Sequence, residues 1–277
     1  MTALATRASL VPRLPAFAAL TAALTLNAFA RSIGQAFGGG VAEDLTVMGG
    51  LLGVSAIVWF ALFAIVKLAL EQDATPASKA DFAVLAGCLL AAVLPIAIAA
   101  AAMVPVVGAY LFRRSAPGTL DRRFAVIVLA LSGPVFFGPV VRVLLGPEWV
   151  KAETLLLAAL FDLPTQGNVI MTEGGRTYVV AGNCSSLHNI SMAILVVASL
   201  SQLLDIRGAW KLAACTALAS LAVIAVNSVR LLMIAKMPDH FDYLHVGGGR
   251  TWFSWAAMLA MTGVTILSLR YVARGKT

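Results

Sequence analysis

Three residues in the carboxy-terminal part of the chain, Cys184, Arg230 and His245, are of the types that nucleophilic acyl transfer uses. A cysteine thiolate is a strong nucleophile near neutral pH, and a histidine can act first as its general base and then as general acid for the leaving amine. An arginine can hold the thiolate, bind a substrate carboxylate or stabilise a tetrahedral oxyanion, and we favour the oxyanion. These three residue types predict a site for nucleophilic acyl transfer through a cysteine.

Cys184 lies in the segment AGNCSSLHN, directly before an apolar run that predicts a helix. Ser185 or Ser186 is expected to cap that helix. Unpaired backbone N–H groups at a helix start favour a thiolate over a thiol, so this position suits a nucleophile. Cys88 and Cys215 lie inside apolar runs, where they are expected to be inert.

Three further polar residues are expected to support the site: His188, Asn227 and Ser185, which directly follows Cys184. His188 lies four residues after Cys184, on the same face of the predicted helix, and is a rival general base, although packing or hydrogen bonding around the site is its favoured role. Asn227 lies three residues before Arg230, which places an amide beside the guanidinium and predicts an inward-facing polar pocket. The alternative for Arg230 is a lipid anchor whose charged end extends to the membrane surface.

A zinc site is a further alternative for the same region, since Cys184, His188, His240 and His245 carry zinc-compatible atoms. No CxxC or HExxH spacing accompanies them in the sequence. We therefore expect neither a metal nor another cofactor.

The composition predicts an integral membrane protein. Hydrophobic residues make up 60% of the 277 positions, charged residues make up 12%, and the mean hydropathy is +0.92, far from the roughly 25% charge of a soluble domain. The formal net charge of +7 comes from Lys and Arg scattered between apolar runs, so it predicts topology signals and no nucleic-acid partner. We expect a single membrane domain over 1–277, with amino-terminal helices over 1–145 and a catalytic-type region over 146–277.

The apolar runs suit membrane-spanning helices, which need about 20 residues each. Run 81–112 contains Pro95 and Pro105 and is too long for one straight pass, so it is either one kinked helix or a helical hairpin. The expected fold therefore has about seven or eight transmembrane helices. The runs lie at 14–30, 46–70, 81–112, 124–145, 187–204, 212–235 and 252–272.

Basic loops predict the orientation, because Lys and Arg concentrate on the cytoplasmic side. Segments 146–186 and 236–251 then share the non-cytoplasmic face of the cell membrane. A cytoplasmic amino terminus with Arg7 and Arg13 favours eight passes. The basic residues of the predicted cytoplasmic loops and tail are Arg113, Arg114, Arg122, Arg123, Arg207, Lys211, Arg270, Arg274 and Lys276.

Two short elements are expected to position the site on the non-cytoplasmic face. Residues 150–162 are too few and too charged to span a bilayer, and they predict an interfacial helix. The β-rich runs NVIMT and RTYVV, separated by a Glu-Gly-Gly turn, predict a β-hairpin that leads to Cys184. The predicted fold class is therefore an all-α polytopic integral membrane protein with a small β-hairpin and an interfacial helix on that face.

The segments PTQGNVIM, GNCSSLHN, NSVRLLMIA and YLHVGGG, in this order, resemble the exosortases and archaeosortases. That family comprises polytopic membrane proteins proposed to act as cysteine transpeptidases on proteins with a carboxy-terminal sorting signal. The resemblance implies that Cys184 is the nucleophile, Arg230 the family arginine and His245 the family histidine. The chain departs from the family pattern twice: Ser186 stands where glycine is usual, and Gly182 stands where an acidic residue is common.

The resemblance implies cleavage of a carboxy-terminal sorting signal on exported, membrane-tethered proteins, through a thioester on Cys184. The alternative is a non-enzymatic transporter or assembly factor for the export of surface protein or polysaccharide, with Arg230 on the substrate path. Transport should survive Cys184→Ala, whereas transpeptidation should not. The expected partners are the tethered protein substrate and the lipid bilayer.

Overall fold

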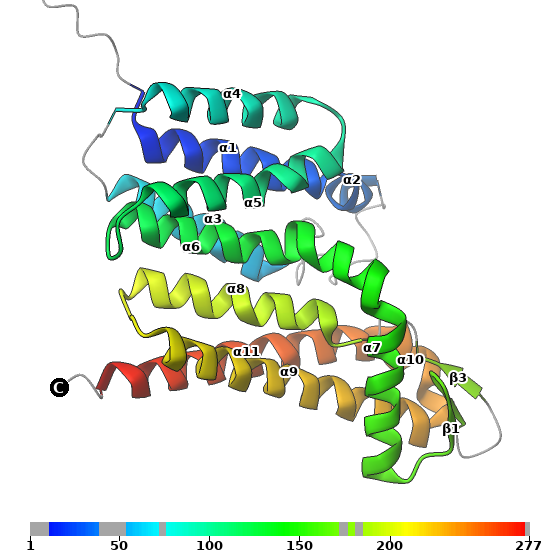
Figure 1. Ribbon diagram of the computed structural model, residues 1–277. Helices are drawn as coiled ribbons and strands as arrows, with labels where there is room; N and C mark the ends of the chain where they lie inside the picture. Colours follow the sequence, from blue (N-terminus) through cyan, green and yellow to red (C-terminus); the bar gives the residue numbers. More distant parts are fainter. Residues whose placement is uncertain (1–10, 39–53, 72–75, 172–176, 181–184, 275–277) are drawn as a thin grey trace, which may run out of the picture.

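The computed structural model describes residues 11–38, 54–71, 76–171, 177–180 and 185–274, most of them in helices (Figure 1). By length and composition, α5, the continuous stretch Leu120–Phe161, α9 and α11 can each cross a membrane, and α3 and α8 are shorter apolar helices. The structure therefore confirms an all-helical membrane protein, while the number of passes stays a prediction. The helices are α1 (Arg13–Ala28), α2 (Ala30–Gly38), α3 (Ala56–Leu70), α4 (Lys79–Val93), α5 (Ala97–Arg114), α6 (Leu120–Ser132), α7 (Gly138–Phe161), α8 (Leu187–Leu203), α9 (Ala209–Lys236), α10 (Phe241–His245) and α11 (Gly248–Arg274).

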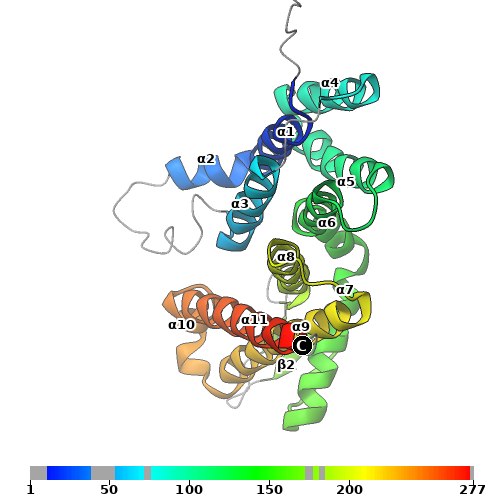
Figure 2. The same ribbon diagram turned by 90° about the vertical axis from the view of Figure 1, so that its left-hand side faces the viewer.

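The two ends of the helix bundle carry different parts of the chain (Figures 1 and 2). At one end lie the α5–α6 and α8–α9 loops and the last turn of α11; at the other lie α2, α10, the sheet and the last part of α7. The two loops are tied together, since Arg207 Nη2 donates to the carbonyl O of Gly118 at 3.3 Å and Arg123 Nε donates to that of Gln202 at 2.7 Å. The basic loops that the sequence predicts on one side of the membrane thus share one end.

Run 81–112 is a helical hairpin, the second of the two predicted alternatives. Helices α4 and α5 are separate and are joined by a short turn around Pro95, whereas Pro105 lies inside α5. The Asn27 side chain of α1 donates from Nδ2 to the carbonyl O of Ala92 at 2.8 Å and to that of Leu94 at 2.9 Å. The last carbonyls of α4 therefore obtain the partners that a helix end lacks.

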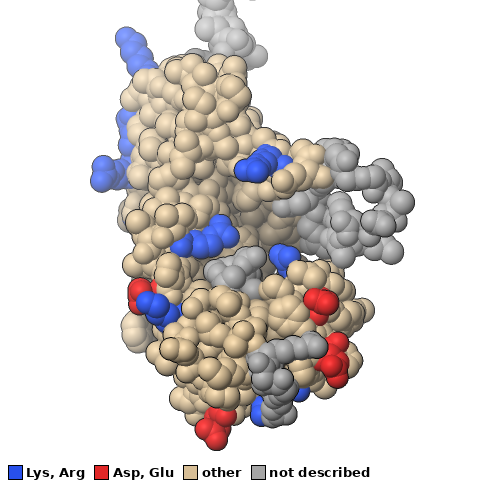
Figure 3. All heavy atoms as spheres, turned by 90° about the vertical axis from the view of Figure 1, so that its right-hand side faces the viewer, with Lys and Arg blue, Asp and Glu red and all other residues tan. Residues whose placement is uncertain are grey.

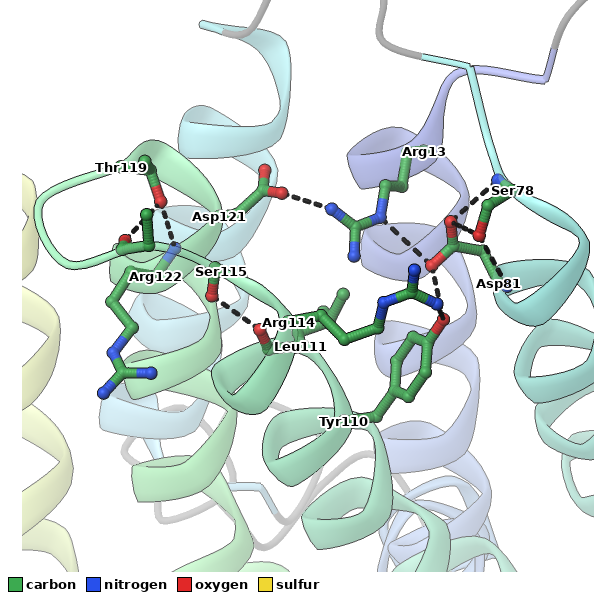
Figure 4. Close-up of polar contacts among 11 residues, drawn as sticks. Arg13, Ser78, Asp81, Tyr110, Leu111, Arg114, Ser115, Thr119, Asp121 and Arg122 are labelled. Carbon is green, nitrogen blue, oxygen red and sulfur yellow. Dashed lines mark hydrogen bonds and ion pairs between the residues drawn. The ribbon is translucent and has the colours of Figure 1, made fainter.

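Arg13 joins three helices at the end of the bundle that holds the α5–α6 loop (Figure 4). Its Nε donates to Asp81 of α4 at 3.1 Å, and its guanidinium also pairs with Asp121 of α6. Asp81 accepts further bonds from the Tyr110 hydroxyl at 2.8 Å and, within a capping box, from the backbone N–H of Ser78 at 2.8 Å. Because Asp81 is only 2% exposed, its charge depends on these partners.

Helices α6 and α7 form one helical path, joined by a π-helical segment, Gly133–Phe137. The prediction for 150–162 is correct in that the region is helical, but wrong about a separate helix, because these residues end α7 and Gly146 and Pro147 lie inside it. Proline bends a helix without necessarily ending it. Figure 1 shows α7 turning away from the direction of α6 to run across the end of the bundle.

A small antiparallel sheet follows α7, with strands β1 (Thr165–Gln166), β2 (Val169–Met171) and β3 (Thr177–Val179) in that order. Ile170 opposes Tyr178, so the predicted pairing of NVIMT with RTYVV is confirmed. Strand β1 was not predicted, and the predicted Glu-Gly-Gly turn lies outside the described residues. Ile170 and Tyr178 are buried in a core cluster with Leu231 and Ile234 of α9, which anchors the sheet on the end of the bundle.

Candidate active site

Helix α9 carries two of the predicted polar residues on its buried side. Most of the helix is apolar, as a membrane span requires, yet Asn227 and Arg230 in its last third are each only 8% exposed. A lipid anchor would extend its charged end to the surface. The burial of Arg230 therefore contradicts the anchor alternative and supports the inward-facing pocket.

Arg230 binds the backbone of α10. Its Nε donates to the carbonyl O of Leu244 at 3.1 Å, and its Nη2 donates to that of His245 at 3.3 Å. Both carbonyls belong to the last turn of α10, where helix carbonyls lack intrahelical partners and a cation is favourable. The structure thus brings the predicted arginine and the predicted histidine together, through the main chain of the histidine.

The His245 side chain packs in an aromatic cluster with Phe241 of α10 and Tyr178 of β3. The ring centroids of His245 and Phe241 are 5.0 Å apart, and those of His245 and Tyr178 are 5.5 Å apart with planes at 78°. Tyr178 and Phe241 complete the cluster at 5.4 Å. Edge-to-face aromatic pairs contribute about 0.5–1.5 kcal/mol beyond the burial of area. The imidazole therefore packs between one ring from the sheet and one ring from α10.

A close approach between α10 and the start of α11 explains part of the glycine run after His245. A Cβ atom at Gly249 would lie 2.8 Å from the carbonyl O of Tyr243 and 3.0 Å from the Cα of Leu244. Real Cβ atoms essentially never approach backbone atoms so closely. Glycine at this position therefore allows α11 to begin directly beside α10.

Burial and nearby charges favour the neutral form of His245. Burial lowers the pKa of His245 below its ordinary value, the charges of Arg230 and Arg250 lower it further, and Asp242 opposes them. A neutral imidazole is the form that accepts a proton from a thiol. His245 therefore has the protonation state that a general base needs at neutral pH.

An acidic residue of α7 accepts hydrogen bonds at the start of α8. Glu153 Oε1 accepts the backbone N–H of Ser186 at 3.0 Å and also binds the Ser186 hydroxyl. The Ser185 hydroxyl accepts the N–H of Leu187 at 3.1 Å, whereas Ser186, which is the cap residue of α8, makes no side-chain cap bond to the helix. The expectation of unpaired N–H groups at this helix start is wrong for Ser186 and Leu187, because side chains already satisfy them.

Sequence reasoning missed Glu153. It lies in the charged, amphipathic-looking part of the 150–162 region, where an acidic side chain is typical of a solvated surface. Its partner is 33 positions away along the chain, and no local pattern connects the two. In the sequence, the signal that could have drawn attention to Glu153 is its place just before the apolar residues 155–161.

The remaining predicted residues lie near this region or outside the described ranges. His188 lines a cleft of about 720 Å³ between α3, α8 and α11, together with Asn189. Cys184 and Gly182 lie outside the described residues, so the position of the nucleophile stays a prediction. Within the described ranges, no three His, Cys, Asp or Glu side chains gather as they would around a metal ion.

Comparison with known proteins identifies the family. A sequence model of the transmembrane exosortase family matches residues 41–262, a range that includes Cys184, Arg230 and His245. No curated protein and no solved structure matches the chain. Because the match covers most of the sequence, the chain belongs to the transmembrane exosortase family.

Proposed function

We propose that this chain is a membrane cysteine transpeptidase or peptidase that cleaves a carboxy-terminal sorting signal from exported, membrane-tethered proteins. Its family supports an exosortase-type sorting enzyme, and the cleavage chemistry is our proposal. The observation that carries it is the pair of hydrogen bonds from Arg230 to the carbonyls of Leu244 and His245. They join two of the three residues that the chemistry requires.

The proposed reaction is acyl transfer through a thioester. His245 takes the proton of the Cys184 thiol, and the thiolate attacks the carbonyl carbon of the scissile peptide bond. The oxyanion that forms is stabilised by Arg230. As the tetrahedral intermediate collapses, the C–N bond breaks and the leaving amine takes the proton from His245. An acceptor amine or water then gives a proton to His245 and attacks the thioester carbonyl, and as the C–S bond breaks the Cys184 sulfur takes that proton back as a thiol.

We further propose that this chemistry takes place on the non-cytoplasmic face. The described site residues lie at the end of the bundle with α10 and the sheet, opposite the end with the basic α5–α6 and α8–α9 loops (Figure 1). Basic loops favour the cytoplasm. An exported substrate that remains tethered by a carboxy-terminal helix would present its peptide bond at that opposite surface.

Trapping the thioester tests the proposal. The full chain, in membranes, is incubated with a reporter that carries an exported domain, one apolar helix and a basic end, and adducts are identified by mass spectrometry. We expect an adduct on Cys184 and loss of cleavage in Cys184→Ala. Cys88→Ala and Cys215→Ala are the matched controls, because both side chains are buried and should not contribute. Normal cleavage by Cys184→Ala would refute the proposal.

A further inference from the structure

We propose that the groove between the end of α8 and the last turns of α11 binds an anionic phospholipid, with one acyl chain in the groove and the phosphate at Arg270. The groove lies at the end of the bundle that holds the basic loops, away from the candidate active site (Figures 1 and 2). The inference is independent of the proposed cleavage chemistry. The lining of the groove includes Leu204, Ile206, Ile266, Leu269, Arg270 and Ala273.

The groove has the size and the lining of a site for a single hydrocarbon chain. Its volume is about 250 Å³, below the roughly 300–1,000 Å³ of pockets that enclose a whole small-molecule ligand. Along α11 the lining extends from Ile266 to Ala273, which is roughly 10 Å at 1.5 Å per residue. Apart from Arg270, every side chain of the described lining is apolar. An acyl chain fits such a lining, and its polar headgroup would lie outside the groove.

The turn after α8 forms one wall of the groove. Asp205 adopts the left-handed conformation, with φ at 49°, which Asp tolerates better than most residues. The chain then folds back, and the backbone N–H of Ile206 donates to the carbonyl O of Ser201 at 2.8 Å. As a result Ile206 is buried, whereas Leu204 stays exposed at the rim. The wall is therefore fixed by backbone hydrogen bonds and by a buried side chain.

Two exposed aromatic side chains place the groove near the level of the lipid headgroups. Trp210 in the first turn of α9 is 86% exposed, and Tyr271 in α11 is 82% exposed. Trp and Tyr concentrate where the hydrocarbon of a membrane meets its headgroups. Arg270 directly precedes Tyr271, so its guanidinium can reach a lipid phosphate while Ile266 and Leu269 lie on the hydrocarbon side.

The charge at this end of the bundle favours an anionic headgroup. The described acidic residues of this end all belong to ion pairs, whereas the exposed Arg270 side chain belongs to none within the described residues. The opposite end, which Figure 3 faces, carries acidic as well as basic side chains on its surface. Basic loops favour the cytoplasm, whose leaflet contains anionic lipids, and a guanidinium binds phosphate in bidentate fashion. The ion pairs at the groove end are Lys67–Glu71, Arg13–Asp81, Arg13–Asp121 and Arg207–Asp205.

Photoreactive lipids test the occupant and its position. The full chain is reconstituted in phosphatidylcholine vesicles with a trace of phosphatidylglycerol or phosphatidylcholine, both carrying the same photoreactive acyl chain. Labelled residues are identified by mass spectrometry. We expect the phosphatidylglycerol probe to label residues 200–206 and 266–273 about fivefold more than the phosphatidylcholine probe does, because an arginine near the membrane surface contributes about that factor.

Variants separate the contribution of the headgroup from that of the acyl chain. Arg270→Gln should remove the preference for phosphatidylglycerol, and Arg270→Lys should keep most of it, since both cations attract phosphate. Arg113→Gln is the matched control, because Arg113 is an exposed arginine of α5 at the same end that does not line the groove. Ala273→Phe should fill the groove and reduce labelling by both probes, whereas Leu267→Phe, on an exposed part of α11 outside the lining, should not.

Four results would overturn the proposal. Equal labelling of the groove by the two probes would show that the headgroup is not recognised, and so would a preference that persists in Arg270→Gln. Labelling spread evenly over the lipid-facing helices would show only the surrounding bilayer. Competition by glycerol phosphate as effective as that by unlabelled phosphatidylglycerol would show a phosphate site that needs no acyl chain.

Discussion

Glu153 of α7 and Ser186 of α8 are joined by two hydrogen bonds, from the backbone N–H and from the hydroxyl of the serine to the same carboxylate. Ser186 is fully buried, so the carboxylate is the partner that replaces water at the start of α8. Because Cys184 is two positions before Ser186, the pair also fixes the chain next to the predicted nucleophile.

Glu153→Ala should loosen the start of α8. It leaves the Ser186 donors without their acceptor, which costs about 1–3 kcal/mol. In hydrogen exchange, the Ser186 amide should exchange about tenfold faster or more. Glu148→Ala is the matched control, since Glu148 lies on the same helix but pairs with exposed Lys151. Unchanged exchange at Ser186 would show that the carboxylate does not hold it.

Arg230→Lys should insert and accumulate normally but be severely impaired in cleavage. A single ammonium group cannot reproduce the fork that reaches both the Leu244 and the His245 carbonyls. Loss of a donor to an oxyanion lowers turnover by about 10²- to 10³-fold. Reporter cleavage at matched membrane levels measures the effect, with Lys211→Arg at the opposite end of α9 as control. Near-normal cleavage by Arg230→Lys would remove this residue from the chemistry.

The pH dependence of cleavage should follow His245. Since burial and Arg230 lower the pKa of His245, the neutral base persists to lower pH than for an ordinary histidine, near 6.5. In the pH profile of kcat/KM, the midpoint of the acid limb should therefore lie below the ordinary pKa of histidine. Removing the opposing charge with Asp242→Asn should move the limb to still lower pH, whereas removing a cation with Arg250→Gln should move it upward. Shifts in the same direction for both variants would exclude His245 as the titrating base.

The Arg13 network should contribute to stability and leave the chemistry untouched. Arg13→Ala strips Asp81 and Asp121 of their shared cation, and breaking a buried pair costs about 3 kcal/mol. The unfolding temperature in detergent should fall, and Asp81→Asn in the same chain should restore part of the loss, because a neutral amide needs no counter-ion. Arg31→Ala, which removes an exposed arginine of α2, should have no effect. If Arg13→Ala and Arg31→Ala lowered the unfolding temperature equally, a role for the ion pairs would be contradicted.

Local sequence patterns predicted the secondary-structure elements better than they predicted which residues of different elements contact each other. Apolar runs predicted the helices, and β-rich runs predicted the pairing of β2 with β3. The prolines of run 81–112 allowed either one kinked helix or a hairpin, and the structure has the hairpin of α4 and α5. The continuity of α7 through Gly146 and Pro147 was missed, because the same residues end helices in other contexts.

Polar contacts between residues far apart in the sequence could not be predicted from it. Arg13 meets Asp81 68 positions later, and Glu153 meets Ser186 33 positions later, while periodicity reports only which side of an element is buried. The family motif did identify Arg230 and His245, which the structure brings together, but not the carbonyl contacts that join them.

Those carbonyl contacts have a consequence for how such proteins diverge. Arg230 recognises main-chain oxygens, which every amino acid provides, so position 244 can vary without losing the bond and no compensating change is required at position 230. Co-evolution analysis detects contacts through paired substitutions. It will therefore not detect this contact between α9 and α10. Relatives that have drifted far in the sequence of α10 can still retain the same arginine in the same place.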